Sequence, residues 1–274
     1  MENESAVSSA KREFRDLGQA LDEAIRQGQF FLVYQPTIDL QTNAFAGVES
    51  LLRWRHVERG VLSPDTFIDE LESSGHIIPV GRWALQTACA QGAAWHDRGY
   101  RFSVSVNVSR LQFEAATFFQ DVADALSSSR FDPSLLVLEF AQATLLADRD
   151  ATGSRLTQLR TLGIQFAVDD FDPSGSALDE LEEFPIDIVK LDRDFVAGLA
   201  TSSEASSLVH RLVESSETRK LQVVAAGIED LEQRTQLQHE KVHVGQGYLF
   251  SRPHEAEEID RFLEDFAIFS GKPL

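Results

Sequence analysis

Residues 135–171, LLVLEFAQATLLADRDATGSRLTQLRTLGIQFAVDDF, decide the fold class. Leu135–Phe140 is an apolar run of the length typical of a buried strand, and Ile164–Phe171 is a second one. Between them, Ser154–Gly163 has helical spacing and ends at glycine, the residue that most often closes a helix. A strand, a helix and a second strand in this order predict two parallel strands with the helix packed outside them.

The same alternation continues outward in both directions along the chain. The further predicted strands are SVSVNVS (Ser103–Ser109), IDIVKLD (Ile186–Asp192), QVVAAGIE (222–229) and VGQGYLF (244–250). The further predicted helices are Val80–Trp95, Gln112–Leu126, about Glu204–Glu217 and Leu231–His239. This many units in one chain favour an α/β fold of the closed (β/α)8, TIM-like type over an open doubly wound sheet, which remains the alternative.

The N-terminal part departs from this alternation. Ser9–Gly28 carries one helical apolar stripe, which predicts either a helix of the domain or a linker helix from an upstream module. FFLVYQP, stopped by Pro36, and FAGVESLLRW then predict two successive strands. We therefore divide the chain into an N-terminal or linker helix (1–28) and one barrel domain (29–274).

Charge and cysteine content exclude some classes of partner. The 274 residues carry a formal net charge of -19, which repels polymeric nucleic acid and anionic membrane. A single cysteine, Cys89, excludes an intramolecular disulfide and fits a reducing cytosol. The sequence shows neither a secretory leader nor a membrane-spanning run, so we expect a cytoplasmic protein without membrane insertion.

Polar side chains lie within or at the ends of the predicted strands. They are Glu49, Asn107, Glu139, Asp169, Asp170, Lys190, Glu229 and Gln246. In a barrel the carboxyl ends of the strands meet at one rim, where the chemistry of this fold takes place. Carboxylate and amide oxygens are the ligands that Mg²⁺ and Mn²⁺ prefer. The sequence therefore predicts a site for one or two such ions at this rim.

These motifs resemble those of the EAL domain family. GVESLLRW resembles the E-A-L-L-R-W signature, with Ser50 in place of alanine, and VNVS, LEF, VDDF, PIDIVKLD and QGYLFSRP follow in the family's order. The resemblance runs from about Phe30 to the end. It implies a TIM-like barrel whose first strand is antiparallel, and a substrate, cyclic di-GMP, that is opened to linear pGpG with two Mg²⁺ or Mn²⁺ ions.

The resemblance also assigns roles to individual residues. It implies metal ligands at Glu49, Asn107, Glu139, Asp169 and Asp170, catalytic groups at Lys190 and Glu229, and substrate contacts at Gln35, Leu52, Arg53 and Gln246. A homodimer contact and an upstream sensor or other protein partner are further expectations.

Three departures from the family pattern argue against full activity. Ala226 stands where the family has a metal-binding glutamate, and loss of such a group typically lowers the rate by about 10² to 10⁴. Asp172 and Pro173 replace a Gly-Thr pair, with Gly175 displaced by one position, and this sequence favours a helix cap followed by a first-turn proline. Gln142 replaces a glutamate that braces the same loop.

Three functions therefore compete. The first is a cyclic di-GMP receptor or regulatory module with weak or absent hydrolysis. The second is a working phosphodiesterase that uses a substitute carboxylate such as Glu229 or Asp172. The third is a protein-interaction barrel that no longer binds the nucleotide. The retained metal-ligand residues favour the first two functions, because a protein-interaction barrel would not need them.

Overall fold

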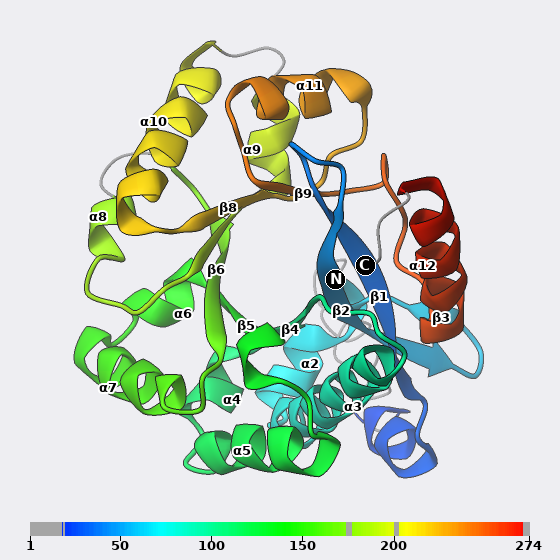
Figure 1. Cartoon of the computed structure of the whole chain (residues 1–274). Coiled ribbons are helices and arrows are strands. Elements are labelled where there is room, and N and C mark those ends of the chain that lie inside the picture. Colours follow the sequence, from blue (N-terminus) through cyan, green and yellow to red (C-terminus); the bar gives the residue numbers. More distant parts are fainter. Residues whose placement is uncertain (1–17, 19, 174–176, 200–202, 271–274) are drawn as a thin grey trace, which may run out of the picture.

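A barrel of β-strands surrounded by helices forms the structure, a computed structural model that describes residues 18, 20–173, 177–199 and 203–270 (Figure 1). Eight of the nine strands in these ranges close into a ring in the order β1-β9-β8-β7-β6-β5-β4-β2, with β1 again paired to β2. Their bounds are β1 Phe30–Asp39, β2 Phe45–His56, β4 Ser103–Asn107, β5 Leu136–Ala141, β6 Gln165–Phe171, β7 Ile188–Leu191, β8 Gln222–Ala225 and β9 Val244–Gln246. The predicted closed barrel is confirmed, and the open sheet is excluded.

Strand β1 is the exception to the parallel arrangement. It pairs antiparallel with both β2 and β9, whereas all other neighbours in the ring are parallel. The strand does not stop at Pro36, as we expected, but continues to Asp39. Proline is tolerated there because pairing with β9 begins only at Thr37, so Pro36 lies beside a single neighbour strand.

The helices cover the outside of the barrel (Figure 1). Their bounds are α2 Ile68–Ser73, α3 Ile77–Asp97, α4 Arg110–Glu114, α5 Phe118–Ser129, α6 Gln142–Leu146, α7 Arg149–Arg160, α8 Ala177–Glu180, α9 Arg193–Gly198, α10 Ser203–Arg219, α11 Leu231–His239 and α12 Ala256–Ser270. Short 3₁₀ turns lie at Pro64–Thr66 and Pro133–Leu135, and β3 (Gly60–Leu62) forms a hairpin with β2. No helix in the described ranges is long and apolar enough to cross a bilayer.

A capping side chain and a glycine mark the two ends of α7, the helix of the strand–helix–strand unit from which we predicted the fold. The Asp148 carboxylate accepts a hydrogen bond from the Ala151 backbone N–H at 3.1 Å and begins α7. Gly163 has a φ of 83° after the end of this helix, a conformation that glycine adopts without strain. The strands on either side, β5 and β6, pair in parallel as expected.

Three element predictions need correction. The single helix expected from Gln112 to Leu126 is two helices, α4 and α5, because Ala115 adopts an extended conformation with a ψ of 135°. The last strand ends at Gln246 instead of running through Phe250. The strand expected over 222–229 ends at Ala225.

The N-terminal segment packs against the barrel. Residues 20–27 are helical, and Leu21 and Ala24 are buried in a cluster with Trp54, Ile77 and Val80. The earlier part of the expected helix, including Phe14 and Leu17, lies outside the described residues. The division of the chain at residue 28 stays a prediction.

Candidate functional site

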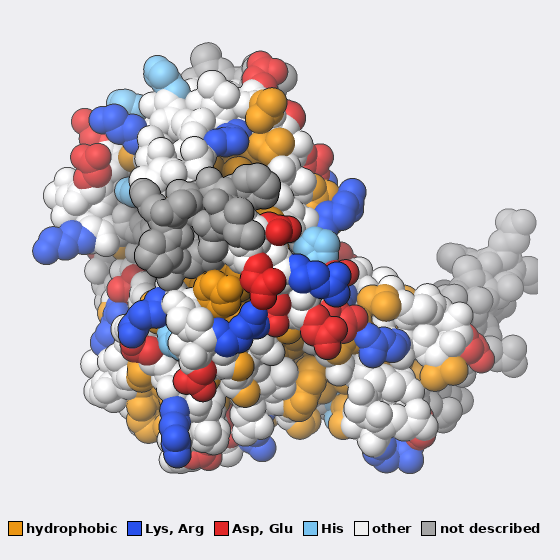
Figure 2. Space-filling model, turned by 45° about the vertical axis from the view of Figure 1, so that its right-hand side comes forward, with side chains coloured by type: hydrophobic (Ala, Val, Ile, Leu, Met, Phe, Trp, Pro, Cys, Tyr) orange, Lys and Arg blue, Asp and Glu red, His pale blue; other side chains and the backbone are white. Residues whose placement is uncertain are grey.

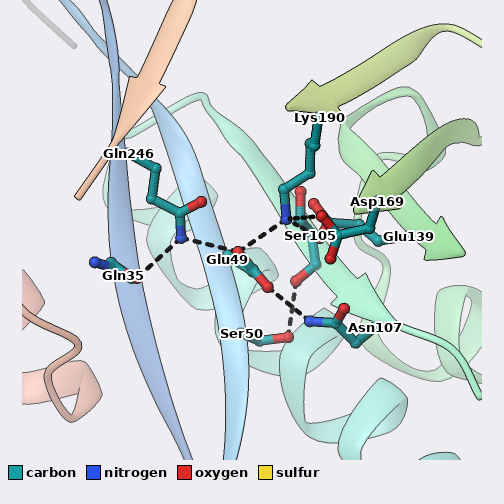
Figure 3. A network of polar contacts seen from close by, with 9 residues as sticks. All are labelled: Gln35, Glu49, Ser50, Ser105, Asn107, Glu139, Asp169, Lys190 and Gln246. Carbon is teal, nitrogen blue, oxygen red and sulfur yellow. Dashed lines mark hydrogen bonds and ion pairs between the residues drawn. The ribbon is translucent and has the colours of Figure 1, made fainter. Parts of the chain in front are cut away.

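The Lys190 ammonium lies among three carboxylates inside the barrel (Figure 3). Its Nζ is 2.5 Å from Glu139 Oε2, 3.1 Å from Glu49 Oε2 and 3.3 Å from Asp169 Oδ1. Lysine lies on β7, and the three acids come from β5, β2 and β6. Lys190 and Glu139 are each only 3% exposed. Four strands that are distant in sequence therefore build one buried ionic cluster, as predicted from their polar ends.

Amide groups fix the Glu49 carboxylate from two sides (Figure 3). Asn107 Nδ2 donates to Glu49 Oε1 at 2.7 Å, and Gln246 Nε2 donates to Glu49 Oε2 at 2.8 Å. Gln246 Nε2 also donates to Gln35 Oε1 at 3.0 Å, and Gln35 donates to the Ser251 carbonyl. The Gln246 oxygen Oε1 is buried and makes no hydrogen bond within the described part of the chain.

Charge and burial act in opposite directions on the pKa values of this cluster. Burial raises the pKa of Glu49, but the charge of Lys190 and the hydrogen bonds from Gln246 and Asn107 outweigh it and hold the pKa below its usual value. Burial disfavours the Lys190 ammonium, yet the surrounding carboxylates raise its pKa well above the usual value. Glu49 and Lys190 are therefore ionised at neutral pH.

Glu139 and Asp170 behave differently, because each lies beside other carboxylates; Glu139 is buried, whereas Asp170 is exposed at the rim. Burial and the negative charge of Glu49 raise the pKa of Glu139 to about 8. Partial burial and the neighbouring Asp169 and Asp192 raise the pKa of Asp170 above its usual value. Asp170 also has a φ of 52°, an uncommon conformation that turns it away from the regular strand. The rim thus holds more negative charge than Lys190 alone neutralises.

The donor set fits a hard divalent cation. One oxygen each from Glu49, Glu139 and Asp169 lie within 4.8 Å of one another. Three carboxylates face one ammonium, and the unpartnered Gln246 oxygen lies nearby on the same rim. Oxygen-only ligand sets with excess negative charge are those that bind Mg²⁺ or Mn²⁺.

A pocket of about 470 Å³ opens beside the cluster. Its lining includes Glu49, Asn107, Glu139, Asp169 and Asp170. Apolar side chains such as Leu52, Ile68 and Val80 also line it, together with Asp65 and Glu72. We call this cavity the rim pocket. Its volume lies within the range of small-molecule sites, and its lining is partly charged and partly apolar.

The predicted site residues Glu229 and Arg53 belong neither to the ionic cluster nor to the lining of the rim pocket. Glu229 is half-exposed and pairs with Arg193 at 2.8 Å. Arg53 is partly buried, and its Nη1 donates to the Leu52 carbonyl at 2.7 Å. The predicted helix cap at Asp172 and Pro173 is not established, since α8 begins at Ala177 and residues 174–176, including Gly175, lie outside the described part.

The site also contains residues that the sequence analysis did not predict. Gln112 and Gly81 line the rim pocket although neither follows a predicted strand. Asp192 lies close enough to raise the pKa of Asp170. Asp192 ends the KLD stretch and directly follows β7, so its position in the sequence could have indicated a place in the site. For Gln112 and Gly81 no local pattern indicates a site.

Comparison with known proteins agrees with this geometry. The EAL domain family model matches residues 18–253. The bifunctional diguanylate cyclase/cyclic di-GMP phosphodiesterase MucR of Pseudomonas aeruginosa is 34% identical over 257 residues, which cover 93% of this chain and 38% of that protein. The cyclic di-GMP phosphodiesterase PdeR of Escherichia coli is 32% identical over 246 residues, covering 90% of this chain and 37% of that protein. The chain thus spans well under half the length of these relatives.

Solved structures give the same result. The MucR phosphodiesterase in complex with c-di-GMP is 35% identical, has a TM-score of 0.85, and covers 89% of this chain and 99% of its own. The EAL enzyme Bd1971 with bound cAMP and cyclic di-GMP is 28% identical with a TM-score of 0.87, and the match covers 95% of this chain and 71% of that one. The range of the family model, residues 18–253, includes every residue of the cluster and the pocket. The chain therefore belongs to the EAL domain family.

Proposed function

We propose that this protein binds cyclic di-GMP in the rim pocket together with Mg²⁺ or Mn²⁺, and that it acts as a receptor or regulatory module with weak or absent hydrolysis. The observation that carries the proposal is the group of carboxylates Glu49, Glu139 and Asp169, paired with Lys190, that lines a pocket large enough for part of a nucleotide. The identity of the proposed ligand comes from the similar MucR phosphodiesterase, whose solved structure is a complex with c-di-GMP.

In this proposal the metal-binding residues are Glu49, Asn107, Glu139 and Asp169, with Asp170 beside a second ion. Bound metal would offset the carboxylate charge and attract phosphate oxygens. Lys190 stays protonated because its pKa is raised, so it donates hydrogen bonds. Gln35, Leu52, Arg53 and Gln246 would contact the ligand, and Leu52 already lines the pocket.

Weak hydrolysis follows from the residue after β8. Side chains alternate along a strand, and Val224 lies in the apolar layer inside the barrel, so Ala226 falls on the same inner side at the rim. A methyl group there neither binds a cation nor accepts a proton. Glu229 does not take its place in this structure, because it is paired with Arg193.

A working phosphodiesterase is the second candidate. It is favoured by the retained residues Glu49, Asn107, Glu139, Asp169 and Lys190, which a pure interaction barrel would not need. The sequence-based expectation of a homodimer, a sensor domain or a protein partner stays a prediction, as does a cytoplasmic location.

Polymeric nucleic acid is not part of the proposal. On the face shown in Figure 2, the described basic side chains are scattered among acidic ones and form no continuous basic stripe. With a net charge of -19 the protein as a whole repels a phosphate backbone. A small ligand that arrives with divalent cations avoids this repulsion.

Two measurements test the proposal. Calorimetry with cyclic di-GMP in Ca²⁺ or Mg²⁺ should show binding to the wild type and none to Glu49→Ala. Anion-exchange chromatography after incubation with Mn²⁺ should show little pGpG. Absence of binding at high micromolar ligand would overturn the receptor, and rapid pGpG formation above the Glu49→Ala background would favour the enzyme.

A further inference from the structure

Gln112 is a largely buried polar residue whose side-chain amide has no hydrogen-bond partner among the described residues. It is the third residue of the short helix α4, and its backbone N–H bonds to the Ser109 hydroxyl at 3.2 Å. The side chain is 3% exposed, and its carboxamide makes no hydrogen bond within the described part of the chain. Unlike the fully buried and unpaired Oε1 of Gln246, the amide atoms of Gln112 keep some contact with solvent, so they are open to a ligand.

Gly81 makes room for this carboxamide. A Cβ built on Gly81 would lie 2.3 Å from Gln112 Oε1, 2.6 Å from Cδ and 2.9 Å from Nε2. Gly81 lies inside α3, where glycine destabilises a helix by about 1 kcal/mol relative to alanine. The helix therefore carries an unfavourable glycine at the position where a Cβ would displace this amide.

The amide faces the rim pocket. Gly81 and Gln112 both line that cavity, as do the apolar side chains of Leu52, Ile68 and Val80. A flat ring fits against apolar walls, and a carboxamide in the lining presents a donor and an acceptor side by side. Glu49, Glu139 and Asp169 line the same cavity, and these carboxylates attract metal-bound phosphate.

We propose that Gln112 is a specificity-determining residue that binds the polar edge of one purine base of the ligand. In this arrangement Nε2 donates to guanine O6 and Oε1 accepts from N1–H, which supplies both partners that the amide lacks. The base lies on the apolar wall, and Gly81 sets the position of the amide. This inference rests on the proposed binding of cyclic di-GMP and deepens it.

The test uses Gln112→Met, which keeps the side-chain volume and removes the amide, and Gly81→Ala, which displaces it. Calorimetry with cyclic di-GMP in Ca²⁺ should show about tenfold to a hundredfold weaker binding for Gln112→Met, as expected for one bidentate base contact. Gly81→Ala should weaken binding in the same direction. Binding of Mn²⁺ without nucleotide should be unchanged in both variants.

Thermal denaturation separates recognition from a structural role. Because the amide has no hydrogen-bond partner among the described residues, Gln112→Met should melt at or above the wild-type temperature. Lower melting of Gln112→Met would assign the amide to folding and overturn the proposal. Wild-type affinity of Gln112→Met for cyclic di-GMP would also overturn the proposal for Gln112. That result would leave the receptor proposal intact. A wild type that binds no cyclic di-GMP removes the receptor proposal itself.

Discussion

At the scale of single residues, the cluster around Lys190 was largely predictable and the rest of the pocket was not. Glu139, Asp169 and Lys190 each lie at or near the end of an apolar strand, and barrel geometry alone brings such positions together. Gln112 and Gly81 meet only because α3 and α4 pack side by side, which no pattern within either segment encodes.

Restoring the missing carboxylate should increase hydrolysis. We expect Ala226→Glu to raise pGpG production by about 10² or more, because the new side chain reaches the inner rim and supplies the absent metal ligand or base. Initial rates with Mn²⁺ measure the change. Ala226→Gln, which has the same length without the charge, is the control. Equal rates in the two variants would place the defect elsewhere, with the loop after Asp172 the next segment to restore.

Glu139 should make the metal-free protein less stable as the pH rises. Its pKa is about 8 in the folded state against 4.5 for the ordinary group. Between these values the folded state holds a proton that the unfolded state has released, so the free energy of unfolding falls with increasing pH. Urea denaturation in EDTA at several pH values measures the slope.

Glu139→Gln is the matched variant for this slope. It keeps the shape of the side chain and has no proton to release, so the fall in stability should be smaller than in the wild type. An identical slope in both proteins would show that other groups, such as Asp170, cause it.

At the scale of elements, strands and helices with a clear apolar period were predicted, whereas breaks and turns were not. The unit β5–α7–β6 was correct because capping by Asp148 and closure at Gly163 agree with the apolar pattern. The break between α4 and α5 was missed. The chain there reads Ala115-Ala116-Thr117, which has no glycine or proline to mark a turn.

The connection after β8 offers an element-scale test. Gly227 has a φ of 75°, and a Cβ built on it would lie 2.3 Å from Arg193 Cγ and 3.1 Å from Arg193 Cα. Gly227→Ala should therefore lower the free energy of unfolding by about 1–2 kcal/mol or more, from backbone strain and the clash together. Urea denaturation measures the loss.

Gly153→Ala is the control for Gly227→Ala. Gly153 lies inside α7, and a Cβ there meets nothing within 4 Å. Alanine should stabilise this helix by up to about 1 kcal/mol. Destabilisation of both variants by the same amount would contradict the explanation from φ and contact at Gly227.

At the scale of the whole molecule, the single thiol reports on unfolding. Cys89 is fully buried in α3, and burial raises its pKa to about 12. We expect no reaction with Ellman's reagent at pH 8 in the native state and one equivalent in urea, because the thiolate is the reactive form. Cys89→Ala gives the background. Rapid labelling of the folded protein would show that α3 opens locally.

The reversed direction of β1 determines where the amino end of the barrel lies. Phe30 pairs with Trp54 near the carboxyl end of β2, so the polypeptide enters the barrel at the rim that carries the acidic cluster. The preceding helical segment, residues 20–27, packs against Ile77 and Val80, and both of these side chains also line the rim pocket. A module fused ahead of this segment would therefore act directly on a wall of the rim pocket, whereas most barrels of this type receive their chain at the far rim.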